Sequence, residues 1–394
     1  MQQKQHSSLP PADAKSAAHS QRVAEFMGRK IAAAGGKISF AEYMHHALYA
    51  PALGYYCAGT TKFGEAGDFI TAPETSSVFG YVLARQCAGV LAEVASPSIL
   101  EFGAGSGRLA ADILTMLAEI DALPDSYRIL EVSPELRERQ EAFLASAVPE
   151  LVDRISWLDR LPDQHTGVIV ANEVLDALPI ERFTRRGDAV IQLCVAVEDG
   201  SFVSAEREAP DTLAAAVGAI EKQLGKQLPD GYVSEVCTAA PHWIGELTRI
   251  LRHGAAFLFD YGVTRREYYA PERSGGWLRC HFRHHAHDDP FILPGIQDIT
   301  AWVDFSLAAE AAAAGGLDVA GFVTQAQFLI GGGLDQVLAD FAKLPIDAQL
   351  KLSGEVKLLT LPGQMGENFK CLGLTRGQIT RPGAFGLADR TTSL

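Results

Sequence analysis

Short apolar runs alternate with amphipathic segments through the centre of the chain. The apolar runs predict strands at residues 98–102, 127–132, 154–158 and 168–172. The segments between the first three runs predict helices at 108–120 and 134–147. Because strands that alternate with crossover helices form a parallel, doubly wound sheet, the pattern predicts an α/β fold with a mostly parallel sheet at its core.

The pattern changes on both sides of this core. Helical spacing predicts N-terminal helices at 20–34, 39–48 and 75–94. After Pro179 we expect a β-meander, a helix, a strand, a helix and a buried strand, at 181–206, 211–225, 232–236, 239–253 and 255–259. The remainder is predicted as a loop-rich stretch, a helix, a strand, a mainly helical segment and a last strand, at 263–295, 298–314, 318–322, 324–350 and 369–375.

One catalytic core with inserted segments explains this order better than separate domains. We expect a disordered lead-in at 1–20, an N-terminal helical or lid region at 21–95 and a tail at 377–394. The core is expected to comprise residues 96–180, 255–262 and 298–376. Two insertions, 181–254 and 263–297, would form an α+β subdomain for the acceptor.

Composition and charge narrow the classes of function. Of 394 residues, 47% are hydrophobic and 21% charged, which is neither a disordered nor a fibrous composition. The 34 basic and 48 acidic residues leave a formal charge of −14, which argues against a nucleic-acid partner. The apolar runs are far shorter than the ~20 residues that span a bilayer, so no membrane insertion is expected.

The cysteines and the N-terminal residues indicate the compartment. The six cysteines are scattered without a C-x-x-C pair, which favours reduced thiols inside a cell. Residues 1–20 contain no apolar signal segment, and the first arginine is Arg22, so we expect neither a secretory signal nor a transit peptide. The expected location is the bacterial cytoplasm, or the mitochondrial matrix if the protein is eukaryotic.

The strongest chemical motif follows the first strand of the predicted sheet. Residues 99–109 read ILEFGAGSGRL: an apolar strand, a glycine turn and the start of a helix. Glycines let the backbone approach a ligand closely, and a helix N-terminus offers N–H groups. A dinucleotide fingerprint would place its third glycine at position 108, which is Arg108, so an NAD-dependent oxidoreductase is disfavoured. The loop favours a nucleotide-type ligand over a merely tight turn.

Glu131 lies near the end of the next predicted strand. A carboxylate at that position can accept hydrogen bonds from both hydroxyls of a ribose. An acidic residue at a solvated strand end is the alternative. Together with the glycine loop, Glu131 favours ribose binding.

Two further segments carry acids. Residues 172–179 read NEVLDALP and follow the fourth strand, so Glu173 and Asp176 would share a face if this segment forms a helical turn. Such a pair could hold a guanidinium, but acids at a helix N-terminus are an equally good explanation. Residues 67–74, GDFITAPE, could form a lid over a ligand or a turn before the next helix.

Residues 279–289 are rich in histidine but do not predict a metal site. Four histidines crowd into one loop without the distant second ligand pair of a closed zinc site. We therefore expect no metal, and regard this loop as polar lining of an acceptor channel.

Taken together, these motifs resemble those of the MidA-type class I S-adenosylmethionine (SAM) methyltransferases, over residues of about 38–373. The E-x-G-x-G-x-G spacing of Glu101 to Gly107 is the one found in class I SAM methyltransferases. The GDFITAPE and NEVLDALP segments are more specific, and they are accompanied by LGYY at 53–56, FDYG at 259–262, PGIQDIT at 294–300 and MGENFK at 365–370. The family includes the mitochondrial protein-arginine methyltransferase needed for assembly of respiratory complex I.

The resemblance implies a Rossmann-like class I methyltransferase sheet, with an N-terminal helical extension and an inserted α+β subdomain, that binds SAM. The implied cofactor contacts are Asp68, Thr71, Glu101, Gly103, Gly105, Gly107, Glu131 and Asn172. Glu173 and Asp176 would be the catalytic carboxylates, with Glu74 or Asp260 as substitutes. One departure is Tyr81, where relatives usually have glutamate.

The implied reaction is methyl transfer to an arginine of a protein acceptor, by resemblance a subunit of respiratory complex I. Two alternatives remain at this point: a methyltransferase for small molecules, and a SAM-binding assembly factor without catalysis. The sequence also leaves a homodimer open.

Overall fold

The structure is a computed structural model that describes residues 9–58 and 71–394. It falls into two units, each built from three stretches of chain. Unit 1 comprises Met1–Phe69, Asp176–Ala240 and Arg265–Trp302. Unit 2 comprises Ile70–Leu175, Pro241–Thr264 and Val303–Leu394. Most of the predicted insertions lie in unit 1 and most of the predicted core in unit 2, although these limits differ from the predicted ones by several residues.

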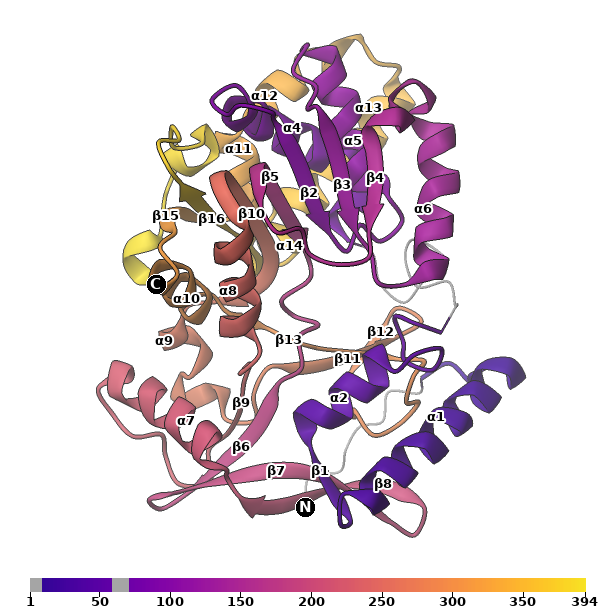
Figure 1. Cartoon of the computed structure of the whole chain (residues 1–394), viewed down its shortest axis with the longest axis vertical. Coiled ribbons are helices and arrows are strands. Elements are labelled where there is room, and N and C mark those ends of the chain that lie inside the picture. The colour runs from indigo at the N-terminus through magenta and orange to yellow at the C-terminus, as the bar shows by residue number, and fades with distance from the viewer. Residues whose placement is uncertain (1–8, 59–70) are drawn as a thin grey trace. The chain divides into compact units, whose positions relative to one another are not determined.

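Unit 2 is organised around an eight-stranded sheet (Figure 1). Its seven main strands are, in spatial order, β15 (Asp318–Thr324), β16 (Phe369–Arg376), β10 (Leu251–Val263), β5 (His165–Asn172), β2 (Ser98–Phe102), β3 (Ser126–Leu130) and β4 (Ile155–Leu158). The short β14 (Val303–Asp304) pairs with β10. The strands from β10 to β4 are parallel, which confirms the predicted sheet, and β16 runs antiparallel to both of its neighbours.

The order of the strands reverses between β2 and β5. From β2 the chain proceeds outward to β3 and β4, and from β5 it proceeds outward on the other side to β10. Ligands of open α/β sheets bind at the carboxyl ends of the strands at such a switch point. The topology therefore predicts a ligand site at the loops after β2, β3 and β5.

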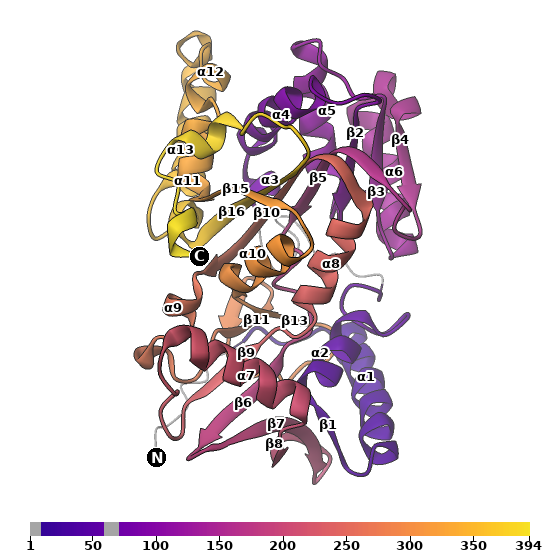
Figure 2. The same cartoon turned by 60° about the vertical axis from the view of Figure 1, so that its left-hand side comes forward.

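Helices cover both faces of this sheet (Figure 2). One face carries α8 (Ala240–Ile250) and α10 (Phe305–Ala314), and the other carries α4 (Ser77–Leu91) and α5 (Arg108–Glu119). The remaining helices of unit 2 are α3 (Ala72–Thr75), α6 (Pro134–Ala147), α11 (Gln325–Gly331), α12 (Leu334–Val337), α13 (Ile346–Thr360) and α14 (Met365–Asn368), with 3-10 helices η1 (Pro149–Arg154), η3 (Phe341–Lys343), η4 (Gly383–Gly386) and η5 (Thr391–Ser393).

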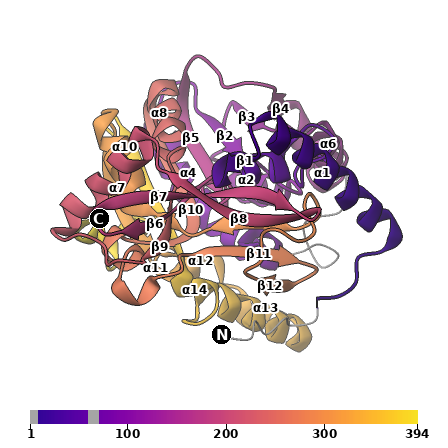
Figure 3. The same ribbon diagram turned by 90° about the horizontal axis from the view of Figure 1, so that it is seen from below.

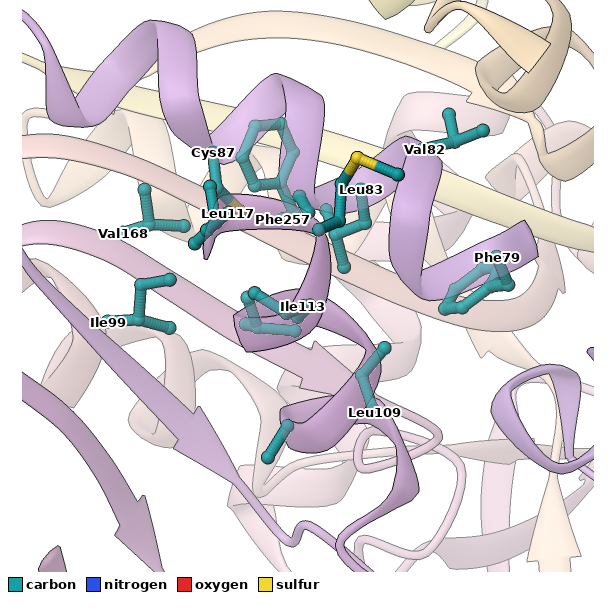
Figure 4. Close-up of a cluster of buried hydrophobic side chains, with 14 of the residues drawn as sticks. Phe79, Val82, Leu83, Cys87, Ile99, Leu109, Ile113, Leu117, Val168 and Phe257 are labelled. Atoms are coloured by element: carbon teal, nitrogen blue, oxygen red, sulfur yellow. The ribbon is translucent and has the colours of Figure 1, made fainter. Parts of the chain in front are cut away.

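The core of unit 2 fills the space between α4, α5 and the sheet (Figure 4). Phe79 and Leu83 of α4, Ile113 of α5, Val168 of β5 and Phe257 of β10 all lie in this cluster and are fully buried. Burial of side chains of this size contributes roughly 1.5–3 kcal/mol each. This packing holds the central strands, and with them the loops at their ends, in fixed register.

Unit 1 contains two smaller antiparallel sheets (Figure 3). The first has β1 (Lys37–Ser39), β7 (Ala189–Glu198), β6 (Glu181–Arg186) and β9 (Val233–Val236) in that order, with β8 (Ser201–Glu208) also paired to β7. The second has β12 (His285–His287), β11 (Leu278–Phe282) and β13 (Asp298–Ala301). The helices are α1 (Ala14–Ala33), α2 (Phe40–Tyr49), α7 (Asp211–Leu224) and α9 (Arg265–Tyr268), with the 3-10 helix η2 (Pro271–Arg273).

Two predicted elements need correction. The first helix begins at Ala14, because the Asp13 side chain accepts a hydrogen bond from the Ser16 N–H at 2.9 Å, so residues 14–20 are helical and not disordered. The helix predicted at 298–314 begins only at Phe305, where Asp304 caps it. Residues 298–301 form β13 instead, because they pair with β11 and are buried on all sides. A short apolar run does not distinguish a buried strand from a helix.

Two further predictions need smaller corrections, the mainly helical segment at 324–350 and the loop-rich stretch at 263–295. The segment expected to be helical to residue 350 continues in α13 to Thr360. The stretch at 263–295 contains α9 and the β11–β12 hairpin. Within the described residues, no helix is both long enough and apolar enough to cross a bilayer.

Candidate functional site

The loop after β2 has the backbone shape that its glycines predict. Gly103, Gly105 and Gly107 have φ angles of 62°, 56° and 88°, a region that other residues adopt only at a cost. A Cβ on Gly107 would lie 3.4 Å from both Leu144 Cγ and Phe143 Cδ1. Gly107 also immediately precedes α5, whose first N–H groups lie at the loop. The Gly103 N–H donates to the Leu130 carbonyl at 3.1 Å and the Gly107 N–H to the Ala104 carbonyl at 2.8 Å. The glycines therefore let the backbone turn tightly beside α6 and add no side chain to the loop.

The segment before α4 is tied to this loop. The Ser106 hydroxyl donates a hydrogen bond to the Glu74 carboxylate, and it accepts one from the Arg108 N–H at 3.2 Å. Thr71 is buried just before α3, and its carbonyl accepts a hydrogen bond from the Thr75 N–H at 3.0 Å. Asp68 lies outside the described residues. Glu74, named above as a substitute catalytic acid, thus contacts the glycine loop.

Glu131 directly follows β3, and its carboxylate is held by two donors. The Ser133 N–H donates to Oε1 at 2.9 Å, and Nε2 of Gln140 donates to Oε2 at 3.0 Å. The side chain is buried at 8% exposure. A carboxylate can accept about four hydrogen bonds in all, so the Ser133 and Gln140 bonds by themselves do not exhaust its capacity.

Glu101 lies beneath the glycine loop at the end of β2. It is 2% exposed, and the Tyr127 hydroxyl donates a hydrogen bond to its Oε2 at 2.8 Å. Burial raises the pKa of Glu101 to about 7; the Tyr127 hydrogen bond opposes this rise, and the nearby Glu131 charge adds to it. Two acidic side chains of the site therefore influence each other.

Asn172 and Glu173 lie where β5 ends. Asn172 Nδ2 donates to Glu173 Oε1 at 3.1 Å, and Asn172 Oδ1 is buried without a hydrogen-bond partner among the described residues. Glu173 has a φ of 54°, and its N–H donates to the Phe259 carbonyl at 2.9 Å. Backbone strain of this kind at a non-glycine residue occurs often at functional sites.

The expected helical turn at residues 173–176 is wrong. No helix forms there, because the Glu173 backbone is left-handed and the Leu175 N–H donates to Asp260 Oδ2, at 2.9 Å. Asp260 is fully buried, and its Oδ1 also accepts from its neighbour Tyr261 N–H at 2.9 Å. Glu173 belongs to unit 2 and Asp176 to unit 1, so the spacing argument for a shared face does not apply.

Within unit 1, Asp176 belongs to a neighbourhood of tyrosines and a second acid. Asp176 is 5% exposed, and its carbonyl accepts a hydrogen bond from the Ala301 N–H at 3.1 Å. Tyr56 donates to Asp298 Oδ1 at 3.0 Å and stacks on Tyr49 with ring centres 5.5 Å apart. Burial raises the pKa of Tyr49 well above its usual value, and the charges of Asp176 and Asp298 add to the shift. These groups create an acidic, aromatic environment.

The histidine-rich segment forms the β11–β12 hairpin of unit 1. Cys280 pairs with His287 in its register and is fully buried. Burial lowers the pKa of His281 to about 4, and the charges of His287 and Arg279 lower it further. In residues 9–58 and 71–394, no group of three or more histidine, cysteine or acidic side chains has an arrangement suited to a metal ion.

The motif search did not identify Gln140 or its partner Trp157. Gln140 Nε2 also donates to the Gly105 carbonyl at 3.0 Å, and its Oε1 accepts from Trp157 Nε1 at 2.9 Å. One signal was present in the sequence: Gln140 is a polar residue on the buried stripe of α6, between Leu136 and Leu144. A buried polar side chain in such a stripe needs partners.

These groups suit a nucleoside with a polar tail. The glycine loop offers a backbone without side chains, Glu131 offers a carboxylate for a sugar diol, and Asn172 Oδ1 offers a buried acceptor for a charged amine. The three lie on loops at the carboxyl ends of β2, β3 and β5. The fold and the site thus define a class of α/β enzymes that bind a nucleoside-containing cofactor at the switch point.

Comparison with known proteins identifies the class more closely. Residues 82–323 match a family model described as "Putative S-adenosyl-L-methionine-dependent methyltransferase". The chain is 32% identical to the mouse mitochondrial protein arginine methyltransferase NDUFAF7 over 89% of this chain and 83% of the relative. The zebrafish protein of the same name is 31% identical over 88% of this chain and 85% of the relative.

A solved structure agrees with these relatives. A superfamily member from Burkholderia thailandensis, crystallised bound to S-adenosyl-homocysteine, is 40% identical and superimposes with a TM-score of 0.92. The alignment covers 98% of this chain and 100% of that chain. The chain belongs to the family of S-adenosyl-L-methionine-dependent methyltransferases. The predicted fold class, cofactor and reaction type are thereby confirmed.

Proposed function

We propose that the protein transfers the methyl group of SAM to an arginine side chain of a protein acceptor. The names of its relatives in mouse and zebrafish support this acceptor class. The observation that carries the proposal is Glu173 at the carboxyl end of β5, whose backbone is strained and whose carboxylate accepts a hydrogen bond from Asn172 Nδ2. A fixed acid at the edge of the cofactor crevice suits a permanently charged guanidinium acceptor.

On this proposal, the residues around the glycine loop hold the cofactor. The backbone of Gly103, Gly105 and Gly107 and the buried Glu101 line the place of the amino acid portion, and Glu131 binds the ribose. Asn172 Oδ1 accepts a hydrogen bond from the amino group. Thr71 and Asp68 are the remaining proposed cofactor contacts, and Asp68 lies outside the described residues.

When bound, SAM supplies a methyl group on a sulfonium, which is already a good electrophile. The protein therefore has to place the acceptor nitrogen in line with the methyl carbon and the sulfur. It also has to keep the positive charge of the guanidinium from opposing attack by that nitrogen on the methyl group. A guanidinium is always protonated, and its lone pairs are delocalised. Glu173 fixes its plane through two hydrogen bonds and draws the positive charge toward one nitrogen, which leaves another more nucleophilic.

Asp176 is proposed as the second carboxylate for the acceptor. Its neighbours in unit 1 support this role, since the stacked Tyr49 and Tyr56 offer aromatic faces and Asp298 offers further negative charge. Aromatic faces and carboxylates are the groups that recognise guanidinium ions.

The experiment supplies tritiated SAM and purified protein to a lysate of the source cells. Label in a protein band, recovered as methylarginine after hydrolysis, supports the proposal. Label only in small molecules would replace it with a small-molecule methyltransferase, and cofactor binding without any transfer would leave a non-catalytic assembly factor. A complex I subunit, implied by the sequence resemblance, is the first acceptor to test, and the bacterial cytoplasm is the proposed compartment.

A further inference from the structure

Gln140 occupies an unusual position for an amide. The buried residues of α6 are Leu136, Gln140 and Leu144, one turn apart, and Gln140 is 0% exposed. Burying an amide without hydrogen bonds costs roughly 1–3 kcal/mol in a protein interior. Here all of the polar atoms of the amide are used, so this residue is adapted to its three partners and not merely tolerated.

The orientation of the amide is determined by its neighbours. Trp157 Nε1 can only donate, so the atom that faces it at 2.9 Å must be Oε1 of Gln140. Nε2 then faces two acceptors, the Gly105 carbonyl and Glu131 Oε2, each at 3.0 Å. One side chain thus joins the glycine loop after β2, the carboxylate after β3 and the indole on β4.

Each of the two donated hydrogen bonds orients a group of the cofactor site. The bond to Glu131 Oε2, together with the Ser133 N–H, fixes the plane of the Glu131 carboxylate. The bond to Gly105 holds the carbonyl of this residue toward α6. In a trans peptide the carbonyl and the following N–H point in opposite directions, so the Ser106 N–H points away from α6.

We propose that Gln140 is a positioning residue for the cofactor, which acts through Glu131 on the ribose diol and through Gly105 on the glycine loop. This inference rests on the role proposed for Glu131. Without Gln140 the carboxylate keeps its charge but loses one of the donors that fix its orientation, so a diol must order it further at the moment of binding. Most of the energetic effect should therefore appear on the two ribose hydroxyls, which Glu131 contacts directly, and none of it on the acceptor.

The test compares two ligands across three proteins. Calorimetry measures the dissociation constants of S-adenosylhomocysteine and of its 3′-deoxy analogue for the wild type, Gln140→Leu and Gln86→Leu. Gln86 is the matched control, because its amide on α4 also makes hydrogen bonds, to the Gly332 carbonyl and from the Ala384 N–H, both at 2.9 Å. Trp157→Phe is a milder second variant, since it keeps an aromatic ring at this position and removes the N–H that fixes the amide.

We expect Gln140→Leu to weaken S-adenosylhomocysteine on the order of tenfold and the 3′-deoxy analogue by much less, with Gln86→Leu changing neither. In turnover assays the KM for SAM should rise while kcat at saturating SAM stays within about twofold. Trp157→Phe should show the same pattern at smaller size, and it serves as the test if Gln140→Leu does not fold.

Equal weakening of both ligands would overturn the proposal, because a general packing defect does not discriminate between them. Unchanged affinity for S-adenosylhomocysteine would overturn it as well. Neither result depends on the acceptor, since no acceptor is present in the binding assay. A failure of this inference is therefore distinguishable from a failure of the proposed arginine methylation, which the labelling experiment reports.

Discussion

Asp260 of β10 accepts a hydrogen bond from the backbone N–H of Leu175 at 2.9 Å, which ties the loop after β5 to the neighbouring strand. The same carboxylate accepts from the Tyr261 N–H through its other oxygen. Because Asp260 is fully buried, neither bond is exchanged with water. The strained backbone of Glu173 lies two residues before Leu175, so this brace helps to determine where the Glu173 carboxylate lies.

Replacing Asp260 with asparagine should therefore reduce catalysis more than cofactor binding. The NH2 group of the asparagine would face the N–H of Leu175 or of Tyr261, and two donors cannot form a hydrogen bond with each other. The loss of that bond should lower the free energy of unfolding by about 1–3 kcal/mol. We expect kcat to fall at least about tenfold, with a smaller change in the affinity for S-adenosylhomocysteine. Asp340→Asn is the control, since Asp340 is 75% exposed in a surface pair. Unchanged kcat in Asp260→Asn would contradict the bracing role.

Glu173→Gln should remove the charge that orients the guanidinium and leave the shape of the side chain. We expect kcat for an arginine-containing acceptor to fall on the order of 100-fold at saturating SAM, with cofactor affinity nearly unchanged. Methyl transfer to peptide and calorimetry with S-adenosylhomocysteine measure the two quantities. Glu150→Gln, on an exposed glutamate of η1, should change neither. Full activity of Glu173→Gln would exclude Glu173 as a catalytic carboxylate.

Gly107→Ala should weaken both the fold and the cofactor site. Its φ of 88° disfavours alanine by about 1–2 kcal/mol, and the new Cβ would crowd Phe143 and Leu144 at 3.4 Å. Gly225→Ala separates these effects, because Gly225 has a φ of 68° but open space around its Cβ. Thermal unfolding should show a loss for both variants, and binding of S-adenosylhomocysteine a loss for Gly107→Ala alone. Intact binding by Gly107→Ala would show that crowding against α6 does not disturb the cofactor site.

The buried Glu101 should make stability fall as the pH rises. Its pKa is raised from 4.5 to about 7 by burial, so between these values the folded state holds a proton that the unfolded state has released. Stability is thus fully retained below pH ~4.5 and declines by on the order of 3 kcal/mol up to pH ~7.

Urea unfolding of the wild type and of Glu101→Gln at several pH values measures this contribution. The glutamine can still accept the Tyr127 hydrogen bond but does not titrate. We expect the wild type to lose stability relative to Glu101→Gln as the pH increases from 5 to 7. Parallel curves for the two proteins would show that Glu101 titrates normally.

Elements with strong local signals were predicted well from the sequence. The strand Ser98–Phe102 and the helix Pro134–Ala147 have the bounds that were expected, because an apolar run before glycines and a proline at the first turn are local features. The segment at 298–304 was misassigned, because its partner strand β11 lies about 20 residues earlier in the sequence. Pairing with a distant strand decided its conformation, and periodicity does not report such pairing.

The sequence by itself determined the parallel core and the glycine loop and identified the acids proposed to bind the cofactor, since each depends on residue type within a short window. Only the tertiary structure decided how those acids are held. Gln140 reaches Glu131 and Gly105 because the fold brings α6 next to the loops that follow β2 and β3, and Asp260 reaches Leu175 because β10 pairs with β5. Contacts between residues distant along the chain depend on packing in three dimensions, and no local pattern of polar and apolar positions specifies them.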